Sequence, residues 1–255
     1  MRFTRHIGID YSGAQTPESR LTGLQVFEAR NGGVPERIGT PATGVKHWTR
    51  LEVAQFCATA VASGEPVIIG IDHAFSFPIS YMKRNGIRRW PRFLDDFMRH
   101  WPTADPHARV DVHRENNPRT GEASELRLCE RWTAGPKSVF QFDVQGQVAT
   151  STHAGLPWLL WLREISRPAA RLHFWPFDGF EVPAGSSVVA EVYPSLFRRR
   201  YPKDDRTPDE HDAYCVAAWL ADMDCRGALE GYFHPPLSAA ELRQCRLEGW
   251  ILGVR

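Results

Sequence analysis

Three acidic side chains lie within or at the end of short apolar segments. The segments are Ile7-Gly8-Ile9-Asp10, Ile68-Ile69-Gly70-Ile71-Asp72 and Val188-Val189-Ala190-Glu191. A carboxylate on a buried strand needs a hydrogen-bond donor, a cation or a metal, because burying its charge alone is costly. Adjacent parallel strands end in a shared crevice, so we expect Asp10, Asp72 and Glu191 to lie close together.

A fourth acidic group opens a predicted helix that begins after Thr207-Pro208. Asp209 and Asp212 are three residues apart, so they can share one helical face. Converging carboxylates repel one another unless a divalent ion neutralises them. Magnesium prefers such oxygen ligands and keeps waters that can act as nucleophiles. The pattern predicts a metal site built from Asp10, Asp72, Glu191, Asp209 and Asp212.

Each of these acids also has a purely structural interpretation. Asp10 could cap the turn that follows it, and Asp72 could be an ordinary turn residue after its strand. Glu191 could pair with one of the arginines at 198–200, and Asp209 could cap the start of its helix. The metal-site interpretation depends on all of the acids occurring together in this order.

The elements that must position these acids follow an α/β order. Strands are expected at about residues 5–11, 21–29 and 36–39, followed by a helix at 48–63 and a strand buried on both faces at 66–72. Later elements are a helix at 156–165 with Ser151 or Thr152 as its N-cap, strands at 171–175 and 187–193, a long helix after Pro208 and a short helix opened by Ser238. Prolines interrupt residues 78–150, where only short helices near 90–99 and 122–131 are expected. The sequence thus predicts one α/β domain over residues 1–255, with a mixed sheet and a large insertion at about 78–150.

The insertion is basic and aromatic. Residues 81–121 carry nine basic and five acidic side chains, a balance of +4 against +1 for the whole chain. Trp90, Phe93, Phe97 and Trp101 interleave with these charges, which suits a nucleic-acid groove. Their spacing is also that of the buried stripe of an amphipathic helix, and we favour a core role for these rings. The candidate substrate-binding residues, from the insertion and from a second basic cluster, are Arg88, Arg89, Arg92, Arg198, Arg199, Arg200 and Lys203.

Composition excludes several classes of protein. A net charge of +1 over 255 residues excludes a wholly basic polymer binder. No segment approaches the ~20 apolar residues of a membrane span, and the N-terminus lacks the apolar core of a signal peptide. The five cysteines are widely spaced without metal-finger patterns, which indicates reduced thiols in the cytoplasm. The chain also has nine tryptophans, which is more than we expect a hydrophobic core alone to require.

Taken together, these motifs resemble the RNase-H-like superfamily, and within it the group of predicted RNase-H-like nucleases. The matching segments are Gly8-Ile9-Asp10-Tyr11-Ser12-Gly13, Gly70-Ile71-Asp72 with Phe75-Ser76-Phe77-Pro78, Glu191-Val192-Tyr193-Pro194, and the segment from Asp209 to Ala218. The last segment is also similar to the acidic helix of Holliday-junction resolvases. The resemblance covers residues 5–78 and 185–222.

The resemblance implies an RNase-H-like mixed sheet, with an antiparallel three-stranded start followed by parallel strands. It also implies a hydrolase: a nuclease that cleaves phosphodiesters in DNA or RNA with two Mg²⁺ or Mn²⁺ ions. In that family pattern Asp10 bridges both metals and Asp72 binds one. Glu191 and Asp212 complete the shell, and Asp209 is an auxiliary ligand.

Two other functions remain open on the same fold. The segment from Gly8 to Ala14 also resembles the first phosphate loop of actin-like and sugar-kinase-like ATPases, although a second glycine-rich loop and an adenosine motif are not evident. A catalytically silent nucleic-acid-binding protein is the other alternative. Retention of the full set of acids argues against it, because loss of catalysis would remove the reason to keep them.

Overall fold

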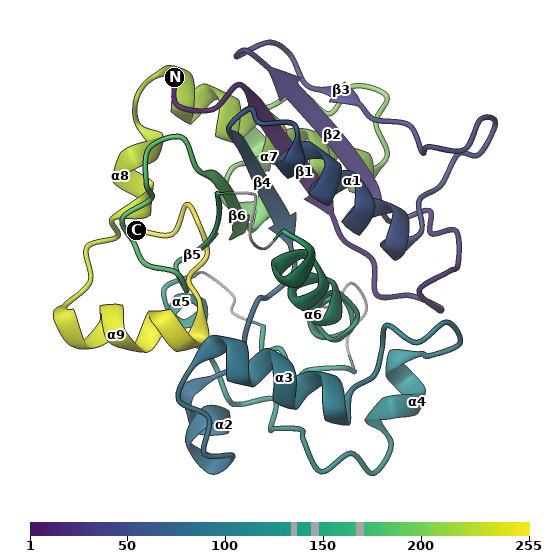
Figure 1. The fold of residues 1–255 in the computed structure, drawn as a ribbon, viewed down its shortest axis with the longest axis vertical. Helices are drawn as coiled ribbons and strands as arrows, with labels where there is room; N and C mark the ends of the chain where they lie inside the picture. The colour runs from purple at the N-terminus through teal and green to yellow at the C-terminus, as the bar shows by residue number, and fades with distance from the viewer. Residues whose placement is uncertain (134–136, 144–147, 167–170) are drawn as a thin grey trace.

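A six-stranded mixed sheet forms the centre of the molecule. The computed structural model describes residues 1–133, 137–143, 148–166 and 171–255. The sheet has the order β3-β2-β1-β4-β6-β5 (Figure 1). The strands are β1 (Arg5–Asp10), β2 (Gln25–Arg30), β3 (Glu36–Arg37), β4 (Val67–Asp72), β5 (Leu172–Trp175) and β6 (Ser187–Glu191). The first three strands pair antiparallel, and β1, β4, β6 and β5 run parallel. The predicted α/β class is confirmed, and both candidates for the fifth strand belong to the sheet.

Helices cover both faces of this sheet. They are α1 (Arg50–Ala62), α2 (Ile79–Arg84), α3 (Trp90–His100), α4 (Val110–Arg114), α5 (Leu128–Arg131), α6 (Val148–Ile165), α7 (Pro208–Cys225), α8 (Leu229–Phe233) and α9 (Ala239–Glu248), with short 3₁₀ turns η1 (Pro194–Leu196) and η2 (Arg198–Arg200). Figure 1 shows α1 and α6 in front of the sheet and α7 behind it. Helices α2 to α5 belong to the insertion, which lies beyond the carboxyl ends of β1 and β4.

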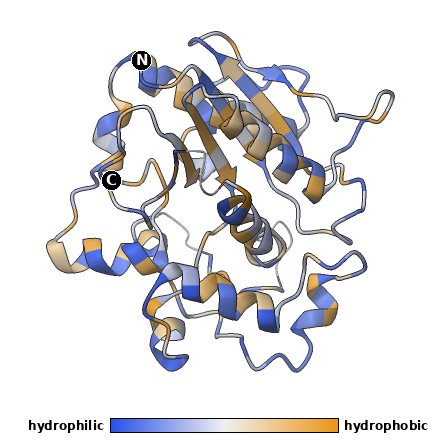
Figure 2. Cartoon of the chain, viewed as in Figure 1, coloured by the Kyte–Doolittle hydropathy of each residue, from blue (hydrophilic) through white to orange (hydrophobic). Residues whose placement is uncertain are grey.

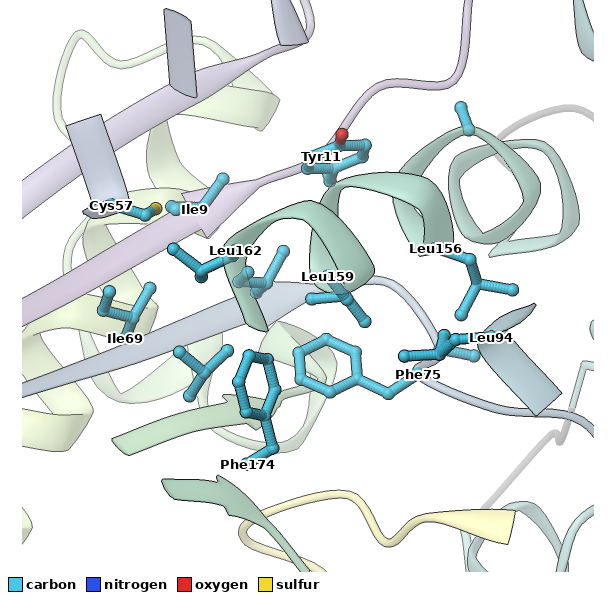
Figure 3. Packing of buried hydrophobic residues seen from close by; sticks show 14 of the residues in the cluster. Ile9, Tyr11, Cys57, Ile69, Phe75, Leu94, Leu156, Leu159, Leu162 and Phe174 are labelled. Atoms are coloured by element: carbon cyan, nitrogen blue, oxygen red, sulfur yellow. The ribbon is translucent and has the colours of Figure 1, made fainter. Parts of the chain in front are cut away.

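The two faces of the central strands carry different residues, because successive side chains alternate. Ile9 and Ile69 point toward α6, where Leu159 packs against the same cluster (Figure 3). Gly8 and Gly70 face α7 instead. A Cβ atom on Gly8 would lie 2.2 Å from the carbonyl oxygen of Ala213, so the helix backbone rests directly on β1. This close approach brings the start of α7 to the ends of β1 and β4.

The insertion shares its core with the sheet. Its aromatic stripe, Trp90, Phe93, Phe97 and Trp101, is at most 1% exposed, which confirms the core role expected for these rings. Figure 2 shows hydrophobic and hydrophilic positions alternating along α3, as in a helix with one buried side. The stripe belongs to the same apolar cluster as Ile9 and Ile69.

The predicted bounds of two helices, at 156–165 and 122–131, are wrong. Helix α6 is described from Val148, well before residue 156, so Ser151 and Thr152 lie inside the helix and neither is its N-cap. Gly155 fits inside this helix because the ring of His73 packs against it, and a Cβ there would lie 2.4 Å from that ring. The helix expected at 122–131 is only the single turn α5.

In the described part of the chain, we find no helix that is both long and apolar enough to cross a membrane. All five cysteines are free thiols. Cys225 at the end of α7 is exposed, and the other four are buried.

Candidate functional site

A cleft of about 750 Å³ opens at the carboxyl ends of β1 and β4. Asp10 and Asp72 are direct register partners on these two parallel strands, and both lie on the face covered by α7. Asp209 and Asp212 enter the same cleft from the first turns of α7. All five predicted metal ligands, Glu191 included, line this cleft, and the four aspartates come from three different elements.

The turn and capping roles considered for these aspartates are filled by other residues. The hydroxyl of Ser12 accepts from the amide of Ala14 in the turn after β1. After β4, the amides of Ala74 and Phe75 donate to Thr152 and Glu191.

At the start of α7, Thr207 is the N-cap and forms a capping box with Glu210. Among the described residues, no hydrogen bond ends on the side chains of Asp10, Asp72 or Asp209. Local hydrogen bonds therefore do not explain these three carboxylates, although Asp209 lies in the first turn of α7, where its charge also favours the helix.

Burial and mutual repulsion disfavour the charged form of the four carboxyl groups. Burial raises the pKa of Asp10 well above its ordinary value, and the charges of Asp72, Asp209 and Asp212 raise it further. Burial, with Asp212 and Glu191 nearby, raises the pKa of Asp72 to about 8, although Arg198 acts in the opposite direction. Burial also raises the pKa values of Asp209 and Asp212. A cation bound among them would relieve this cost.

The chemistry of the donor set fits Mg²⁺ or Mn²⁺, since all four groups are carboxylates. As the side chains stand, no three acidic, histidine or cysteine groups in the described ranges are placed to hold a single ion. Arg198 pairs with Asp212 across 3.5 Å and is half-exposed. Metal binding at these residues would require their side chains to close around the ion.

Glu191 also lines the cleft, but it enters from the other face of the sheet and its carboxylate is paired with an arginine. It is the register partner of Ile71, so its side chain lies on the opposite face from Asp72. Arg127 donates to both of its carboxylate oxygens, at 2.7 and 2.6 Å, and the amide of Phe75 donates to one of them at 3.1 Å. Pairing with an arginine was one of the alternatives considered, but the partner is Arg127 and not a member of the 198–200 cluster.

Arg127 was missed by the sequence analysis. It lies at the start of α5 in the insertion, is 1% exposed, and also donates to Glu130 and to the carbonyl of Glu248. Burial alone would lower the pKa of Arg127, but Cys129, Glu191 and Glu130 raise it well above its ordinary value. No sequence pattern connects Arg127 to a glutamate 64 positions later. The pair forms a fixed wall of the cleft.

The basic residues predicted to bind substrate are mostly elsewhere. Arg198 lines the cleft, whereas Arg199, Arg200, Lys203, Arg88, Arg89 and Arg92 are exposed and are not among its described lining residues. Arg92 lies 3.8 Å from Asp95 in an exposed pair along α3. The insertion instead contributes Lys137 to the cleft, and Arg109 and Arg114 line an adjoining hollow. Of the seven residues predicted to bind substrate, Arg198 is the one among the described lining residues of the cleft, and the substrate-binding role of all seven stays a prediction.

Comparisons of this chain with protein-family models, with curated proteins and with solved structures give no match.

Proposed function

We propose that the protein is a divalent-metal-dependent nuclease that hydrolyses phosphodiester bonds in DNA or RNA. One observation carries the proposal: Asp10, Asp72, Asp209 and Asp212 converge from β1, β4 and α7 in one cleft, and no hydrogen bond among the described residues engages the first three of them. Grouping carboxylates without cations is costly, and a function that uses metal ions explains why they are together.

The sheet supports an RNase-H-like architecture for this nuclease. Its antiparallel β3-β2-β1 start followed by parallel β4 is the arrangement that the sequence resemblance implies. The departure is at the far edge, where β6 lies between β4 and β5. Glu191 on β6 lies in the cleft wall paired with Arg127, so we assign the metal ions to the other four acids.

In this proposal, each group of residues in the cleft has its own role. The four aspartates would hold Mg²⁺ or Mn²⁺, in the two-ion arrangement that the resemblance implies. When bound, such ions activate water and stabilise the leaving oxygen. Arg198 would exchange its weak contact with Asp212 for a phosphate oxygen of the substrate. Arg127 and Glu191 would keep the cleft wall rigid.

The test combines calorimetry and hydrolysis on the purified full chain. We expect Mn²⁺ to bind and to support cleavage of labelled DNA or RNA oligonucleotides. Asp10→Asn should weaken metal binding and lower kcat/KM by more than the roughly 10- to 100-fold typical of outer-shell partners. The matched control is Asp205→Asn, an exposed acid outside the cleft lining.

Three results would overturn the proposal. The first is oligonucleotide binding without hydrolysis under any divalent metal, which fits a silent binding protein. The second is metal-dependent ATP hydrolysis without nuclease activity, which fits the ATPase alternative. The third is equal activity in Asp10→Asn and in the unsubstituted protein, which would indicate a contaminating nuclease.

A cytoplasmic location belongs to the same proposal. It is supported by the five free thiols, four of them buried, since structural disulfides are typical of secreted proteins.

A further inference from the structure

A second hollow adjoins the cleft on the side of the insertion. Its volume is about 560 Å³, and it shares Gly13, Ala14, Phe142 and Thr150 with the lining of the cleft. The two spaces therefore lie side by side. The aspartates line one of them, and Arg109 and Arg114 line the other.

A stack of flat groups ends in this hollow. Trp101 is fully buried, and the ring of Phe142 lies nearly parallel to it, with an angle of 11° between the planes and the centroids 6.3 Å apart. The guanidinium carbon of Arg114 lies over the ring of Phe142, 4.7 Å from its centroid. The side chain of Arg114 is 43% exposed, so the stack presents a planar cation at the surface.

The ion pairs of the two arginines are weak enough to be exchanged. Arg114 pairs with Asp143 at 3.2 Å, and Arg109 pairs with Asp111 at 2.7 Å, but all four side chains are at least 43% exposed. Exposed pairs of this kind contribute little stability. Asp111 and Glu115 also line the hollow, so its attraction for phosphate is local to the two guanidinium groups and is not a general positive field.

We propose that this hollow binds one unpaired nucleotide next to the phosphate cleaved in the cleft, and that the substrate is therefore a single strand. The base stacks on the guanidinium plane of Arg114, and Arg109 binds the adjoining phosphate. A base can stack in this way only after it has left its pairing partner. This inference rests on the proposed nuclease function, but its binding test does not require hydrolysis.

The test is fluorescence anisotropy with Ca²⁺ in place of Mg²⁺. The probes are labelled 12-residue oligothymidylate and oligouridylate, and a mixed-sequence 12-base-pair duplex. We expect single strands to bind at least tenfold more tightly than the duplex. Arg114→Gln should lose about 5- to 100-fold in single-strand affinity, the range of one stacked base. Arg109→Gln should reduce the slope of log affinity against log salt by about 0.7, one phosphate contact on a single strand.

Arg114→Lys and Phe142→Leu separate stacking from charge. Lysine keeps the charge without the plane, and leucine removes the ring beneath the guanidinium, so both should lose most of the affinity that Arg114→Gln loses. The matched control is Arg226→Gln, another exposed arginine in an ion pair, at the far end of α7. Three results would overturn the inference. They are full single-strand affinity in Arg114→Lys, a loss of affinity in Arg226→Gln equal to that in Arg114→Gln, and duplex binding as tight as single-strand binding.

Failure of this inference is distinct from failure of the proposed function. A nuclease that cleaves and binds duplexes as well as single strands would retain the function and lose the single-strand site. Single-strand binding through Arg114 without any metal-dependent cleavage would retain the site and remove the nuclease.

Discussion

Arg198 and Arg199 are neighbours in η2, yet only Arg198 lines the cleft. If Arg198 binds a substrate phosphate, Arg198→Gln should lower kcat/KM by about 10- to 100-fold, the range of one charge-assisted hydrogen bond. Arg199→Gln should stay within about twofold of the unsubstituted protein, since surface substitutions away from such contacts have small effects. Steady-state hydrolysis of one oligonucleotide by both variants checks this, and equal losses would contradict it.

Arg127 compensates two buried carboxylates, so its removal should destabilise the fold. Arg127→Met leaves Glu191 and Glu130 buried without a cation, and we expect a loss of about 3–5 kcal/mol in the free energy of unfolding. Arg226→Met, which breaks an exposed pair, should change that free energy by less than about 1 kcal/mol. Urea unfolding measures both, and a loss under about 1 kcal/mol in Arg127→Met would show that the pair is not needed for stability.

His153 should make the protein less stable in acid. Its Nδ1 donates to the carbonyl of Ala149, its Nε2 has no partner among the described residues, and burial lowers its pKa to about 3. An unfolded histidine has a pKa of about 6.5, so between these values the unfolded chain binds more protons than the folded chain. The contribution of His153 to the free energy of unfolding is therefore fully present well above pH 6.5, and it is lost progressively as the pH falls below 6.5.

The expected loss from His153 is about 2 kcal/mol between pH 7 and pH 5, at about 1.4 kcal/mol per pH unit below 6.5. Urea unfolding of the unsubstituted protein and of His153→Gln at the two pH values isolates this contribution. The variant should show a smaller loss on acidification. An identical pH dependence would mean that His153 is not responsible.

At the scale of elements, the contact between β1 and α7 positions the two halves of the acidic cluster. Gly8→Ala would place a methyl group against the backbone of Ala213 and Ala217. We expect a cost of about 1–3 kcal/mol in the free energy of unfolding, as for other overpacked sites. Because α7 carries Asp209 and Asp212, metal binding should weaken as well.

Gly39→Ala is the control for this substitution, because a Cβ at Gly39 meets nothing within 4 Å. Urea unfolding and Mn²⁺ calorimetry should both separate the two variants. A normal metal affinity in a destabilised Gly8→Ala would show that the spacing of α7 does not govern the site.

The elements also explain which site residues could be predicted from the sequence. Gly8-Ile9-Asp10 and Gly70-Ile71-Asp72 share one pattern, so the register that pairs the glycines also pairs the acids. In β6 the small residue that pairs with Gly70 is Ala190, so Glu191 pairs with Ile71 and faces the other side. An acid at the end of an apolar strand was recognisable from sequence, but its face depends on a register that only the folded sheet defines.

For the whole molecule, the sequence predicts one domain with an insertion. The insertion and the sheet share one apolar cluster, which is what a single domain requires. Phe97 and Phe140 of the insertion pack in the same cluster as Ile9 of the sheet. We therefore expect a single cooperative transition on heating, with equal calorimetric and van't Hoff enthalpies. Differential scanning calorimetry checks this, and two separable transitions would show that the insertion unfolds on its own.

The tryptophans belong mostly to this interior. Five of the nine, Trp90, Trp101, Trp175, Trp219 and Trp250, are at most 1% exposed, and Trp48 is 3% exposed. Composition alone suggested that the core would not need so many. The structure uses them because two apolar clusters, one on each face of the sheet, must be filled.

The exposed thiol of Cys225 offers a reference point on the same helix as the acidic cluster. It follows Asp212 by thirteen residues on α7, a distance of about 20 Å along the helix axis. The other four thiols are buried, so a fluorinated tag would attach to the native chain at one position. Mn²⁺ is paramagnetic and broadens nearby resonances. The line width of that tag would therefore report metal occupancy in solution without any substrate.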